Sequence, residues 1–246
     1  MRKFELLNVR IDSMTFDEIL DFVRFAVREN KKAHIATVNN EFVVEAYKNE
    51  KFANVLRDAS LCIADSVGIV WAIKRYYDVK IERTPGADLF ERICAMSQAE
   101  TTRIYLLGGE KGIAEKSKHF LQSRFKGIHI VGFLDGKSID SNGEDRELIS
   151  EINRTKPNVL FVALGSPKQE LWISKNLARI DCNVFIGIGG TLDFISGRRK
   201  RAPKYMRKAG LEWFFRLIQE PRRFRRILNA TLVFPYLIIF KRNKFC

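Results

Sequence analysis

Six short apolar runs alternate along the chain with stretches whose apolar residues recur at helical spacing, and this alternation constrains the fold more than any other feature. Strands that alternate with amphipathic helices are typical of a mostly parallel sheet with helices on both faces. The apolar runs span residues 33–38, 60–64, 103–107, 128–134, 158–164 and 183–188. The amphipathic stretches span residues 15–30, 86–99, 112–125, 144–154 and 167–179. We therefore expect an α/β fold.

Two of the amphipathic stretches carry helix-start signals. Thr15 and Glu18 have the spacing of a capping box. Pro167 follows Ser166 at the point where another helix is expected to begin, and Pro is favoured in the first helical turn.

The balance of charge changes near Gly197. Residues 198–246 hold 15 Lys or Arg and two acids, whereas residues 1–197 hold 28 Lys or Arg and 27 Asp or Glu. This change predicts a nearly neutral body, residues 1–196, and a basic, partly apolar appendage, residues 197–246. We expect the appendage to contact whatever anionic surface the protein meets.

The appendage also has the features of a membrane-surface segment. Its apolar run, residues 227–240, is 14 residues long and includes Asn229, Thr231 and Pro235, so it is too short and too polar to span a bilayer. Apolar residues beside arginines are typical of a segment in the interface of an anionic membrane, where each basic group contributes about 1 kcal/mol. We expect peripheral association with an anionic membrane surface.

Two further features indicate the compartment. The N-terminal stretch has no uninterrupted apolar segment of the kind found in signal peptides. The four cysteines are far apart, and Cys62 and Cys182 lie in apolar runs, which favours buried, reduced thiols. We therefore expect a cytoplasmic protein attached to the inner face of the cell membrane.

Nearly every expected strand ends in glycines together with a carboxylate, an amide or a hydroxyl. Ligands of open α/β sheets bind outside the carboxyl ends of the strands, so these six ends predict one polar pocket. The ends read TVNNE (37–41), ADSVG (64–68), LLGGEKG (106–112), GFLDG (132–136), ALGSPKQE (163–170) and IGIGGTLDF (187–194). We expect Gly108, Gly109, Gly189 and Gly190 to let the backbone approach a phosphate, and Asp135 to bind the same donor nucleotide. Tight turns without a ligand are the alternative for each glycine pair.

The glycine patterns do not specify the nucleotide. Neither pair matches GxGxxG, so NAD is not indicated, and no Walker loop is present. The three histidines are scattered and no Asp-x-Asp motif occurs, so we expect no metal site and no cofactor. The remaining chemistry is base catalysis by a carboxylate, with cationic side chains in place of a metal. Asp65, which ends an apolar run, is the candidate base, and an N-cap of the next helix is its structural alternative.

Motifs in TVNNEF, ADSVGIVWAIK, ERTPGADLF, YLLGG, ALGSPKQE and GIGGTLDFISGRRKRAP resemble, in this order, those of the WecG/TagA/CpsF glycosyltransferases, from about residue 8 to about residue 226. The resemblance implies a Rossmann-like body with an appendage, and inverting transfer from a UDP-sugar to a lipid-linked acceptor. The most similar branch transfers N-acetylmannosamine to undecaprenyl-diphosphate-linked N-acetylglucosamine, which starts the linkage unit of wall teichoic acid. A related transferase for another UDP-hexose remains open.

The resemblance also implies roles for residues of the body. Asp65 would be the general base, Thr37 and Asn39 would orient the sugars, and Arg83 would bind a phosphate. Gln169 would face the active site, and Asp193 would bind the ribose or the uracil. Helix caps remain the alternatives for Asn39 and for Gln169, which lies three residues after Ser166. A surface position remains the alternative for Arg83, and bracing of the glycine loop remains the alternative for Asp193.

Three arginines of the appendage, Arg216, Arg223 and Arg226, resemble family positions that close over the active site. They would bind the diphosphate of the leaving UDP bidentately. A solvated basic face is the alternative.

Two rival classes and the state of assembly also remain open. A basic chain with Trp and Phe can bind nucleic acid, although the joined apolar run and the polar pocket argue against nucleic acid as a partner. A nucleotide-sugar oxidoreductase is the second rival. Trp71, Ile73 and Tyr76 would either pack a second subunit in a homo-oligomer or belong to the core.

Overall fold

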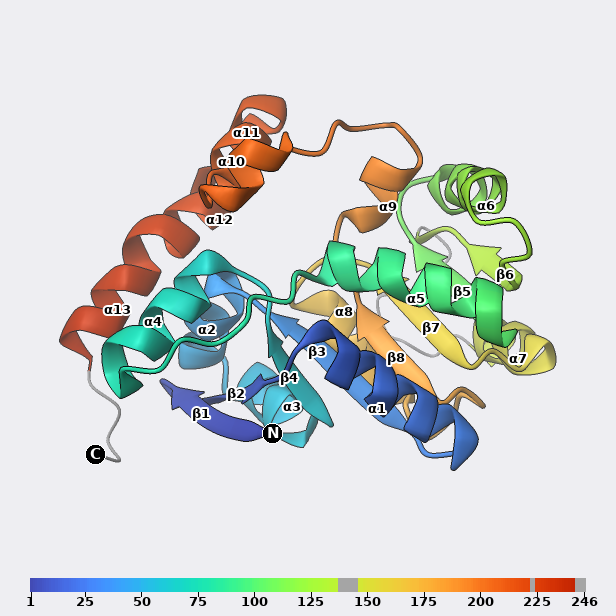
Figure 1. Cartoon of the computed structure of the whole chain (residues 1–246), viewed down its shortest axis with the longest axis horizontal. Helices are drawn as coiled ribbons and strands as arrows, with labels where there is room; N and C mark the ends of the chain where they lie inside the picture. Colours follow the sequence, from blue (N-terminus) through green and yellow to red (C-terminus); the bar gives the residue numbers. More distant parts are fainter. Residues whose placement is uncertain (137–145, 222–223, 242–246) are drawn as a thin grey trace.

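The structure is a computed structural model, and it describes residues 1–136, 146–221 and 224–241. Within these ranges the strands form one eight-stranded sheet in the order β1-β2-β4-β3-β8-β7-β5-β6, in which only the β1–β2 pair is antiparallel (Figure 1). The strands are β1 (Arg2–Leu6), β2 (Val9–Ser13), β3 (Ala33–Val38), β4 (Leu61–Ala64), β5 (Ile104–Gly108), β6 (Ile130–Leu134), β7 (Val159–Ala163) and β8 (Val184–Gly187). The expected α/β fold and all six expected strands are confirmed.

Helices connect and cover these strands. They are α1 (Phe16–Arg28), α2 (Asn40–Lys48), α3 (Glu50–Asp58), α4 (Val67–Tyr77), α5 (Gly86–Glu100), α6 (Ile113–Arg124), α7 (Arg146–Thr155), α8 (Lys168–Asn176), α9 (Thr191–Ile195), α10 (Lys204–Lys208), α11 (Glu212–Gln219), α12 (Phe224–Leu228), the π-helical turn η3 (Asn229–Val233) and α13 (Phe234–Phe240). The five expected helices are confirmed, except that residues 144 and 145 lie outside the described residues. The capping box of Thr15 and Glu18 is present at α1.

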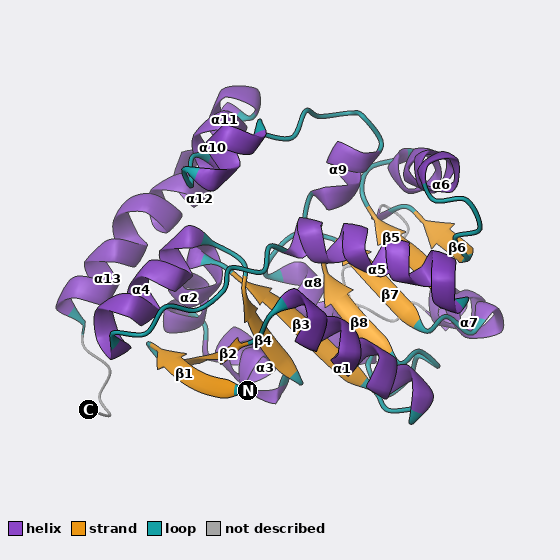
Figure 2. Ribbon diagram, viewed as in Figure 1, coloured by secondary structure: helices purple, strands orange, loops and turns teal. Residues whose placement is uncertain are grey.

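Alternate residues of each central strand enter different cores, as the two-residue period of a strand requires. On β3, Ile35 packs with α1 and α5, whereas Ala36 packs with α2 and α3 on the other face. On β4, Ile63 and Cys62 divide in the same way. Figure 2 shows α1 and α5 in front of the sheet and α2, α3 and α8 behind it. Cys62, Cys94 and Cys182 are buried free thiols, and Cys246 lies outside the described residues.

The sequence analysis missed the N-terminal hairpin of β1 and β2. Its two turn residues, Leu7 and Asn8, have φ of 49° and 69°. A two-residue hairpin turn with both residues at positive φ is usually marked by Asn-Gly or Asp-Gly, and Leu is a poor marker for it. The turn signal is therefore nearly absent from the sequence.

The appendage leaves the sheet after α9 and returns along α2 and α4 (Figure 1). On α13, Phe234, Leu237 and Ile238 are buried in the core that contains α2, α3 and α4. Tyr76 donates a hydrogen bond from its hydroxyl to the carbonyl of Ile238 at 2.6 Å. Ile73 is wholly buried in the same core, which answers the question left open for that residue. Within the described ranges, every helix is too short or too polar to cross a bilayer.

Several basic residues of the appendage are neutralised by acids. Arg201 and Arg207 bind Asp88 at 2.6 and 3.5 Å, Arg198 binds Glu110 at 2.6 Å, and Arg199 binds both Asp193 and Glu220. Part of the positive charge of the appendage therefore fixes it to the body, and contact of the remaining basic residues with an anionic surface stays a prediction.

The packing of α13 predicts unequal effects of two phenylalanine substitutions. Phe234→Ala should lower the free energy of unfolding by about 3 kcal/mol, because a large buried side chain is removed. Phe240 lies on the same helix but is 68% exposed, so Phe240→Ala should change stability by less than about 0.5 kcal/mol. Urea denaturation measures both changes. Equal, small effects would contradict the conclusion that α13 belongs to the cooperative core.

Candidate active site

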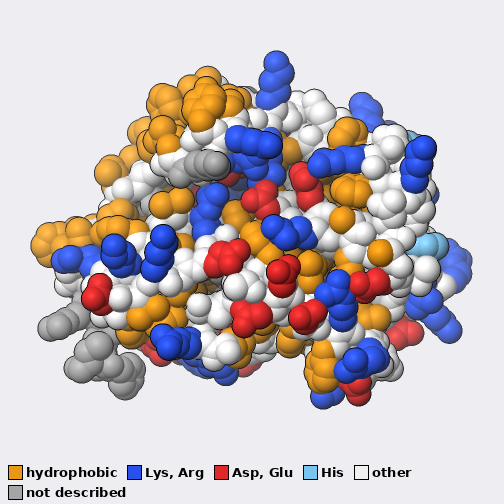
Figure 3. All heavy atoms as spheres, in the orientation of Figure 1, with side chains coloured by type: hydrophobic (Ala, Val, Ile, Leu, Met, Phe, Trp, Pro, Cys, Tyr) orange, Lys and Arg blue, Asp and Glu red, His pale blue; other side chains and the backbone are white. Residues whose placement is uncertain are grey.

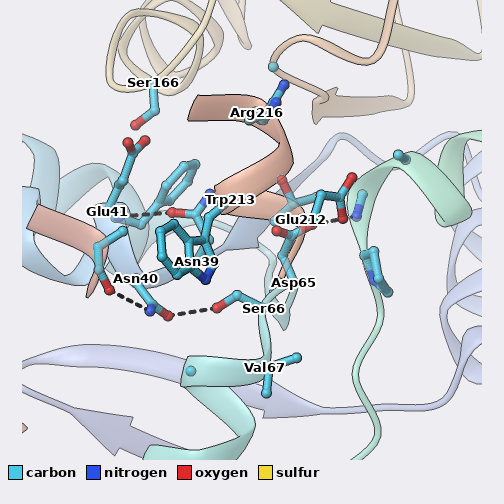
Figure 4. Close-up of a pocket in the computed structure, with 18 of the residues that line it drawn as sticks. Asn39, Asn40, Glu41, Asp65, Ser66, Val67, Ser166, Glu212, Trp213 and Arg216 are labelled. Carbon is cyan, nitrogen blue, oxygen red and sulfur yellow. Dashed lines mark hydrogen bonds between the residues drawn. The ribbon is translucent and has the colours of Figure 1, made fainter. Parts of the chain in front are cut away.

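A cavity of about 640 Å³ opens at the carboxyl ends of β3, β4, β7 and β8, and the appendage closes it from above. From the sheet it receives Thr37, Asp65, Gly165 and Gly189, which follow these four strands or end them. From the appendage it receives side chains of α11 and α12, including Glu212, Trp213, Arg216 and Arg226. Figure 4 shows Asp65 and Glu212 side by side below α11. The cavity therefore lies where open α/β sheets bind ligands.

Asp65 is held with its carboxylate toward this cavity. Its Oδ1 accepts a hydrogen bond from the Gly86 N–H at 2.6 Å, and its own N–H donates to the carbonyl of Val38 at 2.9 Å. The N-cap of α4 is Ser66, whose hydroxyl accepts from the Ile69 N–H. Asp65 is thus not the cap of this helix, and its alternative role in the sequence analysis is wrong.

The environment of Asp65 makes its carboxylate a stronger base. Burial raises the pKa of the Asp65 carboxyl to about 6, and the hydrogen bond from Gly86 opposes this rise. The negative charge of Glu212 raises the pKa further, whereas the positive charges of Arg83 and Arg216 lower it. Because the pKa stays below 7, the carboxylate is mostly ionised at neutral pH and able to accept a proton.

Asn40 links three elements beside Asp65. Ser66 donates to Asn40 Oδ1 at 2.7 Å, and Asn40 Nδ2 donates to the carbonyl of Ala230, in the π-helical turn, at 2.8 Å. A Cβ at position 68 would lie 2.2 Å from Asn40 Oδ1, so a larger residue there would displace the Asn40 side chain from its hydrogen bonds. The glycine of the ADSVG motif therefore has a steric cause: it lets α4 approach the side chain that contacts the appendage.

Thr37 and Asn39 line the cavity from the end of β3. Thr37 donates its hydroxyl proton to the carbonyl of Gly187 at 3.0 Å, which leaves its oxygen able to accept a hydrogen bond. Asn39 is the N-cap of α2, and its Oδ1 accepts from the Phe42 N–H at 3.2 Å. The cap that was the alternative for Asn39 is thus present. Arg83 lines the cavity wall near Asp65, where its charge acts on that carboxylate.

Gln169 shapes the glycine turn after β8. Its Oε1 accepts from the Gly189 N–H at 3.0 Å, and α8 has no side-chain cap, so the capping box expected with Ser166 is not formed. The guanidinium of Arg216 lies directly over Gly190, since a Cβ at this position would be 2.6 Å from Arg216 Nη2. The same guanidinium lies 5.1 Å from the ring centroid of Phe194, as in a cation–π contact.

Two further arginines of the appendage, Arg226 and Arg223, were also expected at the active site. Arg226 lines the cavity, but Glu41 binds its guanidinium bidentately at 3.2 and 2.7 Å. Arg223 lies outside the described residues.

The ends of β5 and β6 do not join the cavity in the described structure, contrary to the expectation of a single pocket for six strand ends. Asp135 accepts from the N–H groups of Gly112 and Ala114 at the start of α6. Gly109 donates to the carbonyl of Ala163 and accepts from Gly136. Gly108, Gly109 and Asp135 thus hold a βα turn together, as tight-turn chemistry does.

Asp193 also lies outside the cavity lining among the described residues. Its carboxylate pairs with Arg198 at 3.6 Å and Arg199 at 3.4 Å, and Arg199 continues to Glu220 at the end of α11. Asp193 therefore ties the start of the appendage to α9 in this structure.

Comparison with known proteins identifies the family. The model of the glycosyl transferase WecG/TagA/CpsF family matches residues 4–245. The chain belongs to this family. Relatives from Staphylococcus aureus strains MW2, NCTC 8325 / PS 47 and COL are named N-acetylglucosaminyldiphosphoundecaprenol N-acetyl-beta-D-mannosaminyltransferase. Each is 29% identical to this chain over an alignment 247 residues long. The alignment covers 98% of this chain and 94% of the relative.

The motifs that resemble those of the family contain residues that make structural contacts as well as residues that line the cavity. In ERTPGADLF, the Gly86 N–H binds Asp65 and the carboxylate of Asp88 anchors Arg201. In ALGSPKQE, Gln169 binds Gly189 and Glu170 binds Gln169. The sequence analysis missed Glu170, although it considered the motif that contains this residue. It also missed Glu212, because the sequence gives no signal for it beyond its helical spacing from Arg216.

In the described residues, no group of three or more His, Cys, Asp or Glu side chains is placed to hold a metal ion. Among the described residues that line the cavity, the cationic side chains are Arg83, Arg201, Arg216 and Arg226, of which Arg201 pairs with Asp88 and Arg226 with Glu41.

The proximity of Glu212 predicts a measurable change in Asp65. Glu212→Gln removes a negative charge that disfavours the ionised form, so the pKa of Asp65 should fall below its wild-type value of about 6. Carboxyl ¹³C NMR titration, with Asp65→Asn to assign the resonance, measures this value. Glu115→Gln, which removes an exposed charge on α6, is the control. A pKa that does not respond to Glu212→Gln, or responds equally to the control, would contradict the electrostatic contact.

Proposed function

We propose that the protein transfers N-acetylmannosamine from UDP-N-acetylmannosamine to undecaprenyl-diphosphate-linked N-acetylglucosamine, with inversion at the anomeric carbon. The observation that carries this proposal is the placement of one basic carboxylate, Asp65, and one guanidinium, Arg216, on the same cavity of a glycosyltransferase family member. The two sugars and the lipid are taken from the names of the Staphylococcus aureus relatives and from the motif resemblance. The transfer would start a wall teichoic acid linkage unit.

Asp65 has the properties that the proposed base requires. In the reaction, the acceptor hydroxyl oxygen forms a bond to the anomeric carbon, and its proton passes to the Asp65 carboxylate. The bond from that carbon to UDP breaks, and its electron pair stays on the β-phosphate oxygen. A carboxylate with a pKa near 6 accepts the proton more readily than one at the ordinary value of 3.8, yet remains ionised at neutral pH.

Polar neighbours of Asp65 would orient the two sugars. The Thr37 oxygen retains acceptor capacity toward a sugar hydroxyl, because its proton is donated to Gly187. Asn39 Oδ1 is occupied by the Phe42 N–H, so its amide N–H₂ is the group left to contact a ligand. Arg83 is placed to bind a phosphate of the donor or the acceptor.

Arg216 would stabilise the departing diphosphate. Arginine binds phosphate oxygens through two parallel N–H groups, and this interaction strengthens as charge develops on the leaving group. Arg216 lies directly over the glycine turn after β8, so we assign it the larger share of this stabilisation. Arg223 keeps the same proposed role through the family resemblance. These guanidinium groups would carry the charge that a divalent metal carries in other transferases.

The base assignment is tested by Asp65→Asn. The variant should retain the fold, because an amide oxygen can still accept from Gly86, and it should lose transfer by about 100-fold or more. The wild-type rate should rise as pH increases through about 6, where the Asp65 carboxyl with its raised pKa loses its proton.

The assay uses a panel of UDP-sugars and a short-chain prenyl-diphosphate sugar, with and without EDTA. We expect highest turnover with UDP-N-acetylmannosamine and unchanged turnover in EDTA. Near-normal turnover by Asp65→Asn, with its fold confirmed by circular dichroism, would refute the role of Asp65. Preference for another UDP-hexose would replace the donor but keep the mechanism.

We also propose that the appendage places the cavity at the inner face of the cell membrane. Figure 3 shows hydrophobic side chains gathered over α10 and α11 and along α13. The exposed members of this apolar surface are Tyr205, Leu211, Trp213, Phe214, Ile218, Phe224, Leu232, Tyr236, Ile239 and Phe240. Because five arginines of the appendage pair with carboxylates, apolar insertion should contribute more of the membrane affinity than the sequence analysis expected.

Membrane association is tested with two exposed residues of this apolar surface. Ile218 and Leu232 are 64% and 63% exposed, so changing both to Asp leaves the core intact. Burial of each side chain contributes about 1.5–3 kcal/mol, so the double variant should sediment with anionic liposomes at least about tenfold more weakly. Phe120→Asp, on α6, is the control and should bind like the wild type. Undiminished binding by the double variant would contradict this orientation of the protein.

A further inference from the structure

Glu170 is a buried carboxyl group directly behind the cavity. It lies in the first turn of α8 and has no exposed surface. Its Oε1 accepts a hydrogen bond from Gln169 Nε2 at 2.7 Å, and its Oε2 has no hydrogen-bond partner among the described residues. A group so buried, with one unsatisfied oxygen, is costly for folding, and such costs are commonly retained at functional sites.

The pair of Gln169 and Glu170 lies against Gly187, the last residue of β8. A Cβ at Gly187 would be 2.3 Å from Gln169 Nε2 and 2.4 Å from Glu170 Oε1, so the strand leaves space for this hydrogen bond. The carbonyl of Gly187 accepts from the hydroxyl of Thr37. The pair is therefore fixed against the strand whose following turn lines the cavity.

Glu170 determines which way the Gln169 amide points. The Gly189 N–H is a donor, so it requires the oxygen of the amide, and the amide nitrogen then needs an acceptor on its other side. Glu170 Oε1 is that acceptor. Without it, the amide can rotate by 180° and place its N–H₂ group against the Gly189 N–H, which breaks the hydrogen bond that shapes the turn.

We propose that Glu170 is a positioning residue: its carboxyl fixes the Gln169 amide and, through it, the Gly189–Gly190 turn on which Arg216 lies. The further step, that this turn then receives the diphosphate of a nucleoside diphosphate, rests on the proposed function. Glu170 itself does not reach the cavity, so it acts only through Gln169.

The carboxyl of Glu170 is mostly neutral near pH 7. Burial raises the pKa of Glu170 to about 8, and the hydrogen bond from Gln169 opposes this rise. Of the elements that pack against α8, β7 and β8 carry no charged residue and the charged residues of α3 are exposed. On β3, burial lowers the pKa of His34 to about 4, and on neighbouring β4 burial raises the pKa of Cys62 to about 12. Both are neutral near pH 7, so no cation among them favours ionised Glu170.

Two variants of similar volume separate positioning from packing. In Glu170→Gln, the amide oxygen accepts from Gln169 and the N–H₂ group replaces the protonated oxygen. In Glu170→Met, the site stays filled but the thioether is only a weak acceptor. The first readout is the amide proton shift of Gly189, which reports its hydrogen bond to Gln169 and does not depend on any activity. We expect the wild-type shift in Glu170→Gln and a changed shift in Glu170→Met.

The second readout is the Kd for UDP, measured by calorimetry from pH 6.5 to pH 9.5. At pH 7, Glu170→Gln should bind within about threefold of the wild type and Glu170→Met at least about tenfold more weakly. Above pH 8 the wild type and Glu170→Gln should both keep their affinity, because an ionised carboxylate and an amide oxygen each accept from Gln169 Nε2. Thermal unfolding confirms the fold of each variant. Wild-type stability should fall as the pH rises from 4.5 to about 8, because the Glu170 carboxyl has the higher pKa in the folded protein. Neither variant should show this part of the fall.

The outcomes separate the two proposals. Equal Gly189 shifts in Glu170→Gln and Glu170→Met would overturn the positioning role, whatever UDP does. An alkaline loss of UDP affinity that the wild type shows and Glu170→Gln lacks would overturn the conclusion that Glu170 acts only by accepting from Gln169. No UDP binding by the wild type, with the expected shifts present, would count against the proposed function and leave the positioning role supported.

Discussion

The burial of α13 against the body is the interaction on which the arrangement of the cavity depends. Phe234, Leu237 and Ile238 enter the core, and each buried side chain of this size contributes about 1.5–3 kcal/mol. The ion pairs that Arg201 and Arg226 make with the body are partly exposed, and such pairs contribute about 0–1 kcal/mol each. Apolar packing therefore supplies most of the attachment, whereas the ion pairs determine its orientation. Together they hold α11, with Glu212 and Arg216, above Asp65.

Charged side chains at the cavity have opposite effects on the pKa of Asp65. Asp65 comes from the sheet, while Glu212, which raises its pKa, and Arg216, which lowers it, come from one face of α11. Any movement of α11 thus changes both the pKa of Asp65 and the position of Arg216, the side chain proposed to bind the phosphate. On the opposite wall, the uncharged chain from Glu170 through Gln169 to Gly189 shapes the turn below Arg216. The two walls meet at Gly190, which has no side chain to separate them.

The sequence predicted what depends on local pattern and missed what depends on pairing in space. Apolar runs gave the six central strands, but the β1–β2 hairpin turns at Leu7 and Asn8, which are weak turn markers. Five of the six strand ends contain glycine and polar residues and look alike in sequence, yet Asp135 and Gly109 make their hydrogen bonds within a βα turn. Two of the acids that pair with arginines of the appendage, Asp88 and Glu41, are over 100 residues from these arginines, so no local pattern shows them. For the same reason Glu212 was not associated with Asp65.

The central claim is that the glycine turn after β8 and Arg216 hold a diphosphate beside Asp65. A crystal structure of the Asp65→Asn variant with a UDP-sugar donor tests it most directly, because this variant should bind the donor without turning it over. The account predicts a diphosphate against Gly190 and the Arg216 guanidinium, with the anomeric carbon facing position 65. A diphosphate bound instead at the end of β5, beside Gly108 and Gly109, would contradict it.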